Sequence, residues 1–468
     1  MWPTENTILL LFIGLLPLLF VVAQCKKYGF KSFLGLKFIG VIFIWIGYQL
    51  SPWIGYFKAE RWDVFLLVEE YIDQGIIFST MCMFVYVFGF SVRFRGRGDN
   101  DFVRLNTNIR VPKIKIGYLI IFAVSSFMAF VITSGGLVEI WRSSLPRGAG
   151  QFLERDAVGK VFQMINVISV VLHSILACAS SLFIIQSRKS PFFQIVGWCC
   201  LLISSLSSIS FFSRAAGYSF VIFSFICLKI NGLRAIPNAL LALFVAVYLG
   251  SVGLNERNNF HPGLGNFIDA VSLPNVIKGQ SDVDSAPSLL ANPFDALAPW
   301  TRKARVAETE FSSILTMGPR FFWNLHPFPS EIVPLLPLGR DLAEIMGVYG
   351  HFGITTPALA ELFYAFGHFG CLLLFPLGML YSWIEKTQER NPNFVALISN
   401  ILCFISFPIG LHSSMRAMTR PLVYAIFLLL LAKYIKSIKR NLFANDLSGK
   451  PRSSNKLAAS NNRYGSLK

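Results

Sequence analysis

Arginine side chains near the ends of long apolar runs are the first candidates for chemistry in this 468-residue chain. Arg214, Arg257, Arg416 and Arg420 lie at or just beyond such ends, and the short turns among them contain no lysine. The planar guanidinium group can bind two phosphate oxygens at once, whereas lysine offers a single point charge. The pattern favours binding of a phosphate group. The alternative is that these side chains anchor helix ends at a membrane surface.

One carboxylate is placed where it could act on a substrate. Glu361 is the one acidic residue that falls inside a predicted apolar span, between Pro357 and the glycines Gly367 and Gly370. Proline and glycine allow a membrane helix to break and line a cavity. An ionisable side chain inside a membrane is by default a candidate functional group. Glu361 is therefore a candidate base; the alternative is a structural partner for an outward arginine.

Histidine could supply the base instead, because imidazole gains and loses a proton near neutral pH. Five histidines are expected on the outer side: His261, His326, His351, His368 and His412. No two histidines have the i, i+4 spacing of a helical metal site, and the eight cysteines form no Cys-x-x-Cys pair. Two Asp-x-Asp triplets, at 99–101 and 282–284, are weak metal candidates. We expect neither a metal nor a cofactor.

The composition places these side chains in a membrane. The chain is 54% hydrophobic and only 14% charged, with a mean hydropathy of +0.56. A soluble domain carries about 25% charged residues, so this chain cannot cover a water-facing surface of its own size. The net charge of +17 would suggest nucleic acid for a soluble protein. In a membrane protein, the positive charge instead reflects how lysine and arginine are divided between the two sides of the membrane. We expect lipid and no nucleic acid as a partner.

The fold class that follows is all-α, a polytopic membrane protein with about eleven transmembrane helices. Runs of about 17–25 apolar residues qualify as spanning helices, and the alternating pattern of a β-barrel is absent. The predicted spans are 7–23, 33–54, 75–92, 116–135, 161–186, 192–212, 214–230, 235–253, 355–384, 394–413 and 420–436. The sixth and seventh are separated by an interruption at 213–215, because one helix over 192–230 would be about 58 Å long.

The charges give the orientation. With the N-terminus outside and the C-terminus inside, the inward segments contain more than half of the 42 Lys and Arg residues and few of the 25 acids. This agrees with the rule that lysine and arginine accumulate on the cytoplasmic side. The first span has no basic residue before it and no cleavage site after it, so we expect it to be retained.

The chain divides into four predicted parts. Residues 1–253 contain spans one to eight with an outer loop at 136–160, and residues 354–440 contain spans nine to eleven. Between them, 254–353 forms a large periplasmic loop that is rich in proline and aromatic residues and therefore expected to fold against the membrane face. The basic tail, 441–468, is expected to be a disordered cytoplasmic segment.

The segment 347–370, GVYGHFGITTPALAELFYAFGHFG, resembles the Wzy-type O-antigen (oligosaccharide repeat-unit) polymerases. That family shows an acidic residue, an aromatic residue and an "nFGxxG" element that opens a late span. The matching positions here are Glu361, Tyr364, Gly367 and Gly370, with Phe366 where asparagine is common. The turn at 213–217 is similar to the family's "sRg" turn, and Arg416 and Arg420 match its last outer loop.

The resemblance implies an inner-membrane enzyme of Gram-negative envelope assembly, multi-pass, with an active site facing the periplasm. It implies a glycosyltransferase of the all-helical membrane (GT-C-like) type, which needs no metal. The substrate would be an oligosaccharide on undecaprenyl pyrophosphate, polymerised into O-antigen or a related surface polysaccharide. The protein partners would be a flippase and a chain-length regulator.

The same resemblance suggests residue roles. Arg214, Arg257, Arg416 and Arg420 would bind the donor pyrophosphate and stabilise the leaving group. Glu361 or His351 would orient or deprotonate the acceptor hydroxyl. We accordingly predict Glu361, His351, Arg214 and Arg416 as catalytic. The predicted substrate-binding residues are Arg257, Arg420, Tyr364 and Trp323, of which the two aromatic side chains would face sugar.

Two other functions stay open at this stage. O-antigen ligases share much of this layout and would transfer the finished glycan to lipopolysaccharide. A flippase or transporter for lipid-linked sugars would carry repeated halves and polar residues at the membrane midplane, and we find no matching halves in the sequence.

Overall fold

The structure is a computed structural model, and it describes residues 5–50, 69–92, 113–133, 157–209, 217–258, 264–271, 312–326, 358–390, 393–412 and 414–448. Every regular element in these ranges is a helix. Five helical runs are long and apolar enough to cross a membrane: Ile8–Lys27, Asp73–Ser91, Tyr218–Gly250, Ala358–Arg390 and Met415–Ile438. Five further apolar helices are shorter. The all-α membrane class is thereby supported; the number of spans and their orientation stay predictions.

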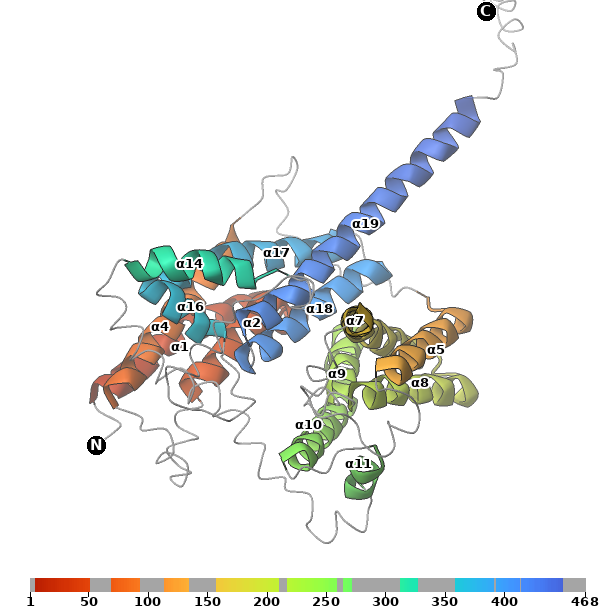
Figure 1. Cartoon of the computed structure of the whole chain (residues 1–468), viewed down its shortest axis with the longest axis horizontal. Coiled ribbons are helices and arrows are strands. Elements are labelled where there is room, and N and C mark those ends of the chain that lie inside the picture. Colours follow the sequence, from red (N-terminus) through yellow and green to blue (C-terminus); the bar gives the residue numbers. More distant parts are fainter. Residues whose placement is uncertain are drawn as a thin grey trace, which may run out of the picture.

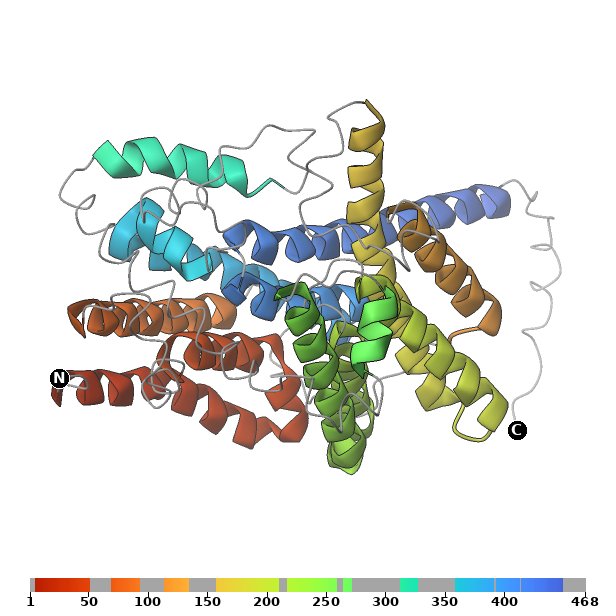
Figure 2. The ribbon, with the colours of Figure 1, turned by 60° about the horizontal axis from the view of Figure 1, so that its bottom comes forward.

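The helices form two groups that lie beside each other (Figure 1). The first contains α1 (Glu5–Tyr28), α2 (Leu36–Trp45), α4 (Glu69–Ser91), α16 (Ala358–Phe366), α17 (Leu374–Arg390), α18 (Phe394–His412) and α19 (Met415–Ser448). The second contains α5 (Ile116–Thr133), α7 (Ala157–Gln186), α8 (Pro191–Ile209), α9 (Tyr218–Asn231) and α10 (Ile236–Asn258). A second view shows the same helices turned by 60° (Figure 2), and within the second group α9 packs on both α7 and α10.

Large apolar side chains on the outside of both groups explain why the chain needs lipid. Phe88 on α4 and Phe244 on α10 are each more than two thirds exposed. Patches of this kind are rare on soluble monomers, and helices satisfy their own backbone polar groups in lipid. On α4 and α10, accordingly, apolar residues are spread around the whole circumference of the helix.

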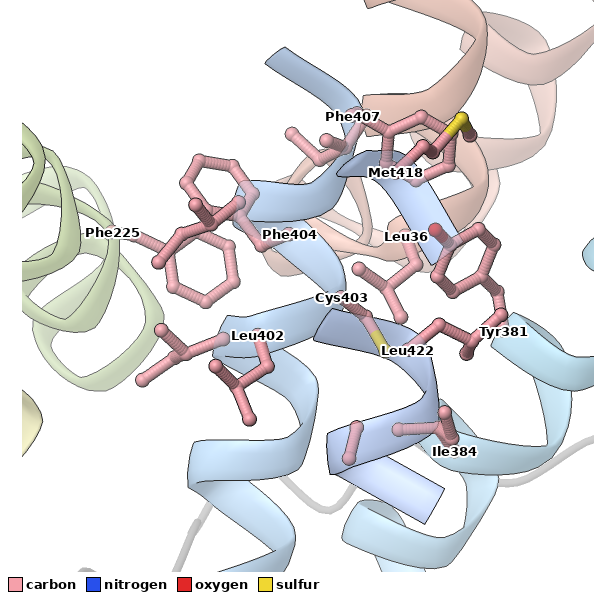
Figure 3. Packing of buried hydrophobic residues seen from close by; sticks show 14 of the residues in the cluster. Leu36, Phe225, Tyr381, Ile384, Leu402, Cys403, Phe404, Phe407, Met418 and Leu422 are labelled. Carbon is pink, nitrogen blue, oxygen red and sulfur yellow. The ribbon is translucent and has the colours of Figure 1, made fainter. Parts of the chain in front are cut away.

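The two groups meet through aromatic rings. Phe225 of α9 stacks on Phe404 of α18 with ring centroids 4.4 Å apart, and Figure 3 shows the Phe225 ring extending from the second group toward α18. Deeper in the first group, Tyr86 donates a hydrogen bond to the carbonyl oxygen of Leu36 at 2.8 Å and packs edge-on against Phe407. These rings form the core between distant parts of the sequence.

Polar side chains join the groups near their predicted inner ends. The Lys229 ammonium group, in the last turn of α9, donates hydrogen bonds to Gln388 of α17 at 2.8 Å and to Asn400 of α18 at 2.9 Å. Lys37 of α2 donates to Gln24 and Ser91 in the same manner. The two lysines therefore tie helices together and are not simply solvated charges.

Several predicted boundaries need correction. The span expected at 33–54 begins later, because a 3-10 turn, η1 (Phe30–Leu34), follows Gly29 at φ +89°. The helix then runs from Leu36 through a π-helical turn, η2 (Ile46–Leu50), to the last described residue of this range. The cause is local, because the Ser32 hydroxyl bonds to the carbonyl oxygens of Cys25 and Gly29 and turns the chain before α2 begins. The predicted interruption at 213–215 lies outside the described residues, which stop at Ile209 at the end of α8 and resume at Gly217 before α9.

Other helices extend beyond their predicted ends. α7 begins at Ala157, inside the predicted outer loop 136–160, and α19 continues to Ser448, eight residues into the predicted tail. The predicted large loop contains two helices among its described residues, α11 (Leu264–Val271) and α14 (Ser312–Asn324). α11 packs on α10 and α14 packs on α16.

Candidate anion-binding site at the start of α19

The break that the glycines predict lies directly after the helix that carries Glu361. α16 ends at Phe366, and a 3-10 segment, η7 (Gly367–Leu373), connects it to α17. Gly367 has φ +57°, a conformation that side-chain-bearing residues rarely adopt. A Cβ atom on Gly370 would lie 2.5 Å from the carbonyl oxygen of Leu362, so the chain folds back closely on α16. The predicted helix break is confirmed.

Glu361 lies on α16 with its carboxylate buried against the start of α19. Its side chain is 8% exposed, and its Oε2 atom accepts a hydrogen bond from the backbone N–H of Met415 at 2.9 Å. Met415 is the first residue of α19. The first N–H groups of a helix have no partner within the helix, and the helix dipole makes that end positive. A carboxylate in this place satisfies one donor and stabilises the charge at the helix start.

The start of α19 is built by a serine cap and a close helix hairpin. The Ser414 hydroxyl accepts a hydrogen bond from the Ala417 N–H at 3.1 Å, which is the bond of an N-cap residue. A Cβ atom on Gly410 of α18 would lie 2.5 Å from the Cβ of Met418, so α18 and α19 approach closely there. Two contacts of different kinds therefore determine the direction of the first turn.

Arg416 and Arg420 lie on one face of this first part of α19. Residues four apart are neighbours on a helix surface, and Tyr424 continues the same row. The positive charge of Arg416 interacts with the Glu361 carboxylate, and both arginines interact electrostatically with the Tyr424 phenol. Sequence analysis expected these arginines in a short outer turn. They lie within α19 instead, because Ser414 begins the helix before them.

We call Glu361, the Met415 N–H, Arg416 and Arg420 the α19 site. It combines a helix start with two guanidinium groups and a single carboxylate. The dipole of a helix N-terminus attracts anions, and arginine adds a fork that fits phosphate. The N–H groups of Met415 and Ala417 are already bonded to Glu361 and Ser414, so the two guanidinium groups would supply the hydrogen bonds to the anion. The chemistry that this arrangement suits is the binding of a phosphate or pyrophosphate group.

Of the remaining predicted site residues, the structure describes the side chains of two. Tyr364 lies one turn beyond Glu361 on α16 and is 8% exposed. Trp323 lies on α14 and is 52% exposed. Arg257 belongs to the last turn of α10, where the backbone alone is described, and Arg214 and His351 lie outside the described residues. The structure thus brings together Glu361, Arg416 and Arg420 among the eight predicted site residues.

Of the predicted outer histidines, His368 of η7 packs its ring against Phe363 at 5.1 Å and near Phe78 at 6.3 Å. This aromatic surrounding suits a packing role. His261 lies outside the described residues, and for His412 the structure describes the backbone only. His326 follows α14, where its ring lies 6.1 Å from that of Trp323.

Sequence reasoning overlooked a buried polar cluster around His173 of α7. Its Nδ1 atom forms a hydrogen bond with Ser126 of α5, and its carbonyl oxygen accepts one from Ser204 of α8 at 2.8 Å. Ser204 in turn contacts the hydroxyl of Ser219 at the start of α9 at 2.9 Å. A histidine in the middle of an apolar run was the available signal.

Within the part of the chain that the structure describes, no three metal-ligating side chains come together. Comparison of the whole chain with family models, with curated proteins and with solved structures returns no match.

Proposed function

We propose that this protein is a glycosyltransferase that polymerises lipid-linked oligosaccharide repeat units into O-antigen or a related surface polysaccharide. The observation that carries the proposal is the α19 site, in which Arg416 and Arg420 share one face at a helix start beside a buried carboxylate. It is supported by the resemblance of 347–370 to the repeat-unit polymerases. The proposed location is the periplasmic face of the bacterial inner membrane.

In the proposed reaction, the hydroxyl oxygen of the acceptor sugar attacks the anomeric carbon of the donor glycan. A new C–O bond forms as the bond between that carbon and the pyrophosphate oxygen breaks. The bonding electrons leave with undecaprenyl pyrophosphate, and the hydroxyl proton passes to a base. Negative charge therefore develops on the leaving oxygen, where preorganised donors lower the barrier most.

The α19 site suits the leaving-group side of this reaction. Arg416 and Arg420 would bind the pyrophosphate oxygens and stabilise the charge that develops there. We assign Glu361 as a positioning residue, because one of its oxygens is occupied by the Met415 N–H and the side chain is buried. Tyr364, one turn away, would line the same region. Arg214, Arg257 and His351 stay candidates for the remaining roles, with His351 as the base.

The test is the lipopolysaccharide made by cells in which variants replace the native protein. A cell without polymerase still transfers single repeat units, so its lipopolysaccharide should show one unit and no ladder. We expect this pattern for Arg416→Ala and Arg420→Ala at normal protein levels. Arg234→Ala is the control, because this exposed arginine lies in a turn between α9 and α10, in the predicted inner part of the chain.

Each other outcome has a definite meaning. A bare lipid core in the Arg416→Ala cells would refute polymerisation and favour a ligase or a flippase. A normal ladder in both arginine variants would show that the α19 site only anchors helix ends.

A further inference from the structure

Helix α14 lies in the periplasmic segment 254–353 that sequence analysis expected to fold against the membrane face, and its composition suits a membrane-surface helix. Residues 312–326 contain no acidic side chain and one basic side chain, Arg320. Nearly half of the segment is large and apolar: Ile314, Leu315, Met317, Phe321, Phe322, Trp323 and Leu325. A periplasmic loop in water would be polar, so this composition needs an apolar environment.

One side of α14 is fixed to the end of α16. The Phe321 ring is 1% exposed and lies edge-on to Phe366 at 5.2 Å between centroids. A Cβ atom on Gly318 would lie 3.1 Å from the Phe366 ring, so the absence of a side chain allows this approach. Phe322 also contacts the Phe366 ring at 5.7 Å. Phe366 therefore packs against Gly318, Phe321 and Phe322 of α14.

Phe366 connects α14 to a candidate membrane span. It is the last residue of α16, which belongs to the run Ala358–Arg390, long and apolar enough to cross a membrane. The α14 side chains that contact Phe366 therefore lie against this run. If the run crosses the bilayer, these side chains lie at or within the membrane.

The two rings that follow Phe321 on α14 are open to the exterior, although Phe322 also touches Phe366 with part of its ring. Phe322 is 53% exposed and its neighbour Trp323 is 52% exposed. Tryptophan is enriched where hydrocarbon meets headgroups, because one end of its ring system is apolar and the other is a hydrogen-bond donor. A sugar in that interfacial region would lose water from its hydroxyl groups, which is costly without a hydrogen-bond partner for each.

We propose that α14 is embedded in the interfacial region of the outer leaflet, with Phe322 and Trp323 in contact with phospholipid. The partner of this surface is lipid, and Trp323 is assigned to it in place of the sugar-facing role expected from sequence. By packing on Phe366, the embedded helix would support, from the lipid side, the helix break at η7. The inference stands on the packing of α14 and the exposure of its rings, and so it is independent of the proposed function.

The test uses spin labels and their collisions with two relaxation agents. The chain is placed in nanodiscs of phosphatidylethanolamine and phosphatidylglycerol, and Cys199, the exposed member of the eight cysteines, is changed to serine. Nitroxide labels are attached singly to Phe322→Cys and Trp323→Cys. Oxygen concentrates in lipid and a polar nickel chelate in water, so their collision ratio reports depth.

Two further positions calibrate the ratio. Phe244→Cys on α10 is 69% exposed and serves as the lipid standard, and Lys189→Cys, exposed in the turn between α7 and α8, serves as the water standard. We expect ratios at 322 and 323 between the two standards and closer to that of Phe244→Cys. A ratio equal to the water standard would overturn the proposal and return the ring pair to a glycan role. Low collision with both agents would also overturn it, because protein would then cover the rings.

Discussion

The exchange of Glu361 for glutamine distinguishes a positioning residue from a catalytic base. Glutamine keeps a carbonyl oxygen that can accept the hydrogen bond from the Met415 N–H, which is 2.9 Å long in the native protein. It removes the negative charge, and with it any ability to accept a proton at neutral pH. Alanine removes both the bond and the charge.

The expected magnitudes follow from the hydrogen bond. A bond to a charged group contributes about 1.5–3 kcal/mol and a neutral bond about 0.5–1.5 kcal/mol. Glu361→Gln therefore loses about 1 kcal/mol of hydrogen-bond energy. If this loss shifts Arg416 and is felt fully in the transition state, the rate of elongation falls roughly fivefold. Glu361→Ala loses the whole bond, or roughly 10- to 150-fold. Removal of a general base would instead cost about 10²–10⁴-fold in both variants.

The assay is the initial rate of glycan elongation by purified protein in proteoliposomes supplied with lipid-linked repeat units. Asp269→Asn serves as the control, since Asp269 is an exposed carboxylate on α11, which packs on α10. We expect Glu361→Gln to retain activity within about tenfold of the native protein. If it were as inactive as Glu361→Ala while both proteins kept native thermal stability, Glu361 would be the base and our assignment would be wrong.

Three further outcomes are expected. Lys229→Met should lower the thermal stability of the protein, because its two amide partners lose a donor at a cost of about 1–3 kcal/mol each; unchanged stability in detergent would show that water replaces the lysine. Gly370→Ala should destabilise by about 1–3 kcal/mol through the 2.5 Å approach of its Cβ to a carbonyl oxygen, whereas Gly117→Ala, with nothing within 4 Å of its Cβ, should be neutral or stabilising. Reporter fusions after Gly265 and after Arg440 should report the periplasm and the cytoplasm respectively; the reverse pattern would overturn the orientation and the side of the active site.

The existence of the helices was predictable because lipid leaves the chain little choice. All eleven predicted apolar ranges overlap a helix among the described residues. Backbone groups in hydrocarbon must be satisfied within the segment, and an apolar run of sufficient length is therefore enough to predict a helix. The break near Glu361 was predictable for a related reason, since Gly367 is the residue type that permits φ +57°.

Where helices begin was less predictable, because apolar length says little about caps. Arg416 and Arg420 were expected in a turn, yet α19 includes both. The Ser414 cap and the contact of Gly410 with Met418 decide the first turn. The second of these depends on how two helices pack, which a single sequence does not express.

Polar contacts between distant segments were the least predictable feature. Lys229 lies at the inner end of the predicted span 214–230, and its partners Gln388 and Asn400 lie more than 150 residues away. His173 and Ser126 meet only because α5 and α7 pack side by side. Helical spans that look alike in sequence carry no mark of which neighbour they contact, so these pairs require the tertiary structure.

Charge balance explains why a carboxylate lies beside two arginines in the α19 site. Arg416 and Arg420 are one helical turn apart at the positive end of α19, so without a substrate they repel each other and the helix dipole. Glu361 offsets part of this charge from a buried position, and the Met415 N–H keeps it there. Two guanidinium groups and one carboxylate leave a net positive charge in the α19 site. A ligand with more than one negative charge would complete the balance, whereas a neutral sugar would not, and pyrophosphate is such a ligand.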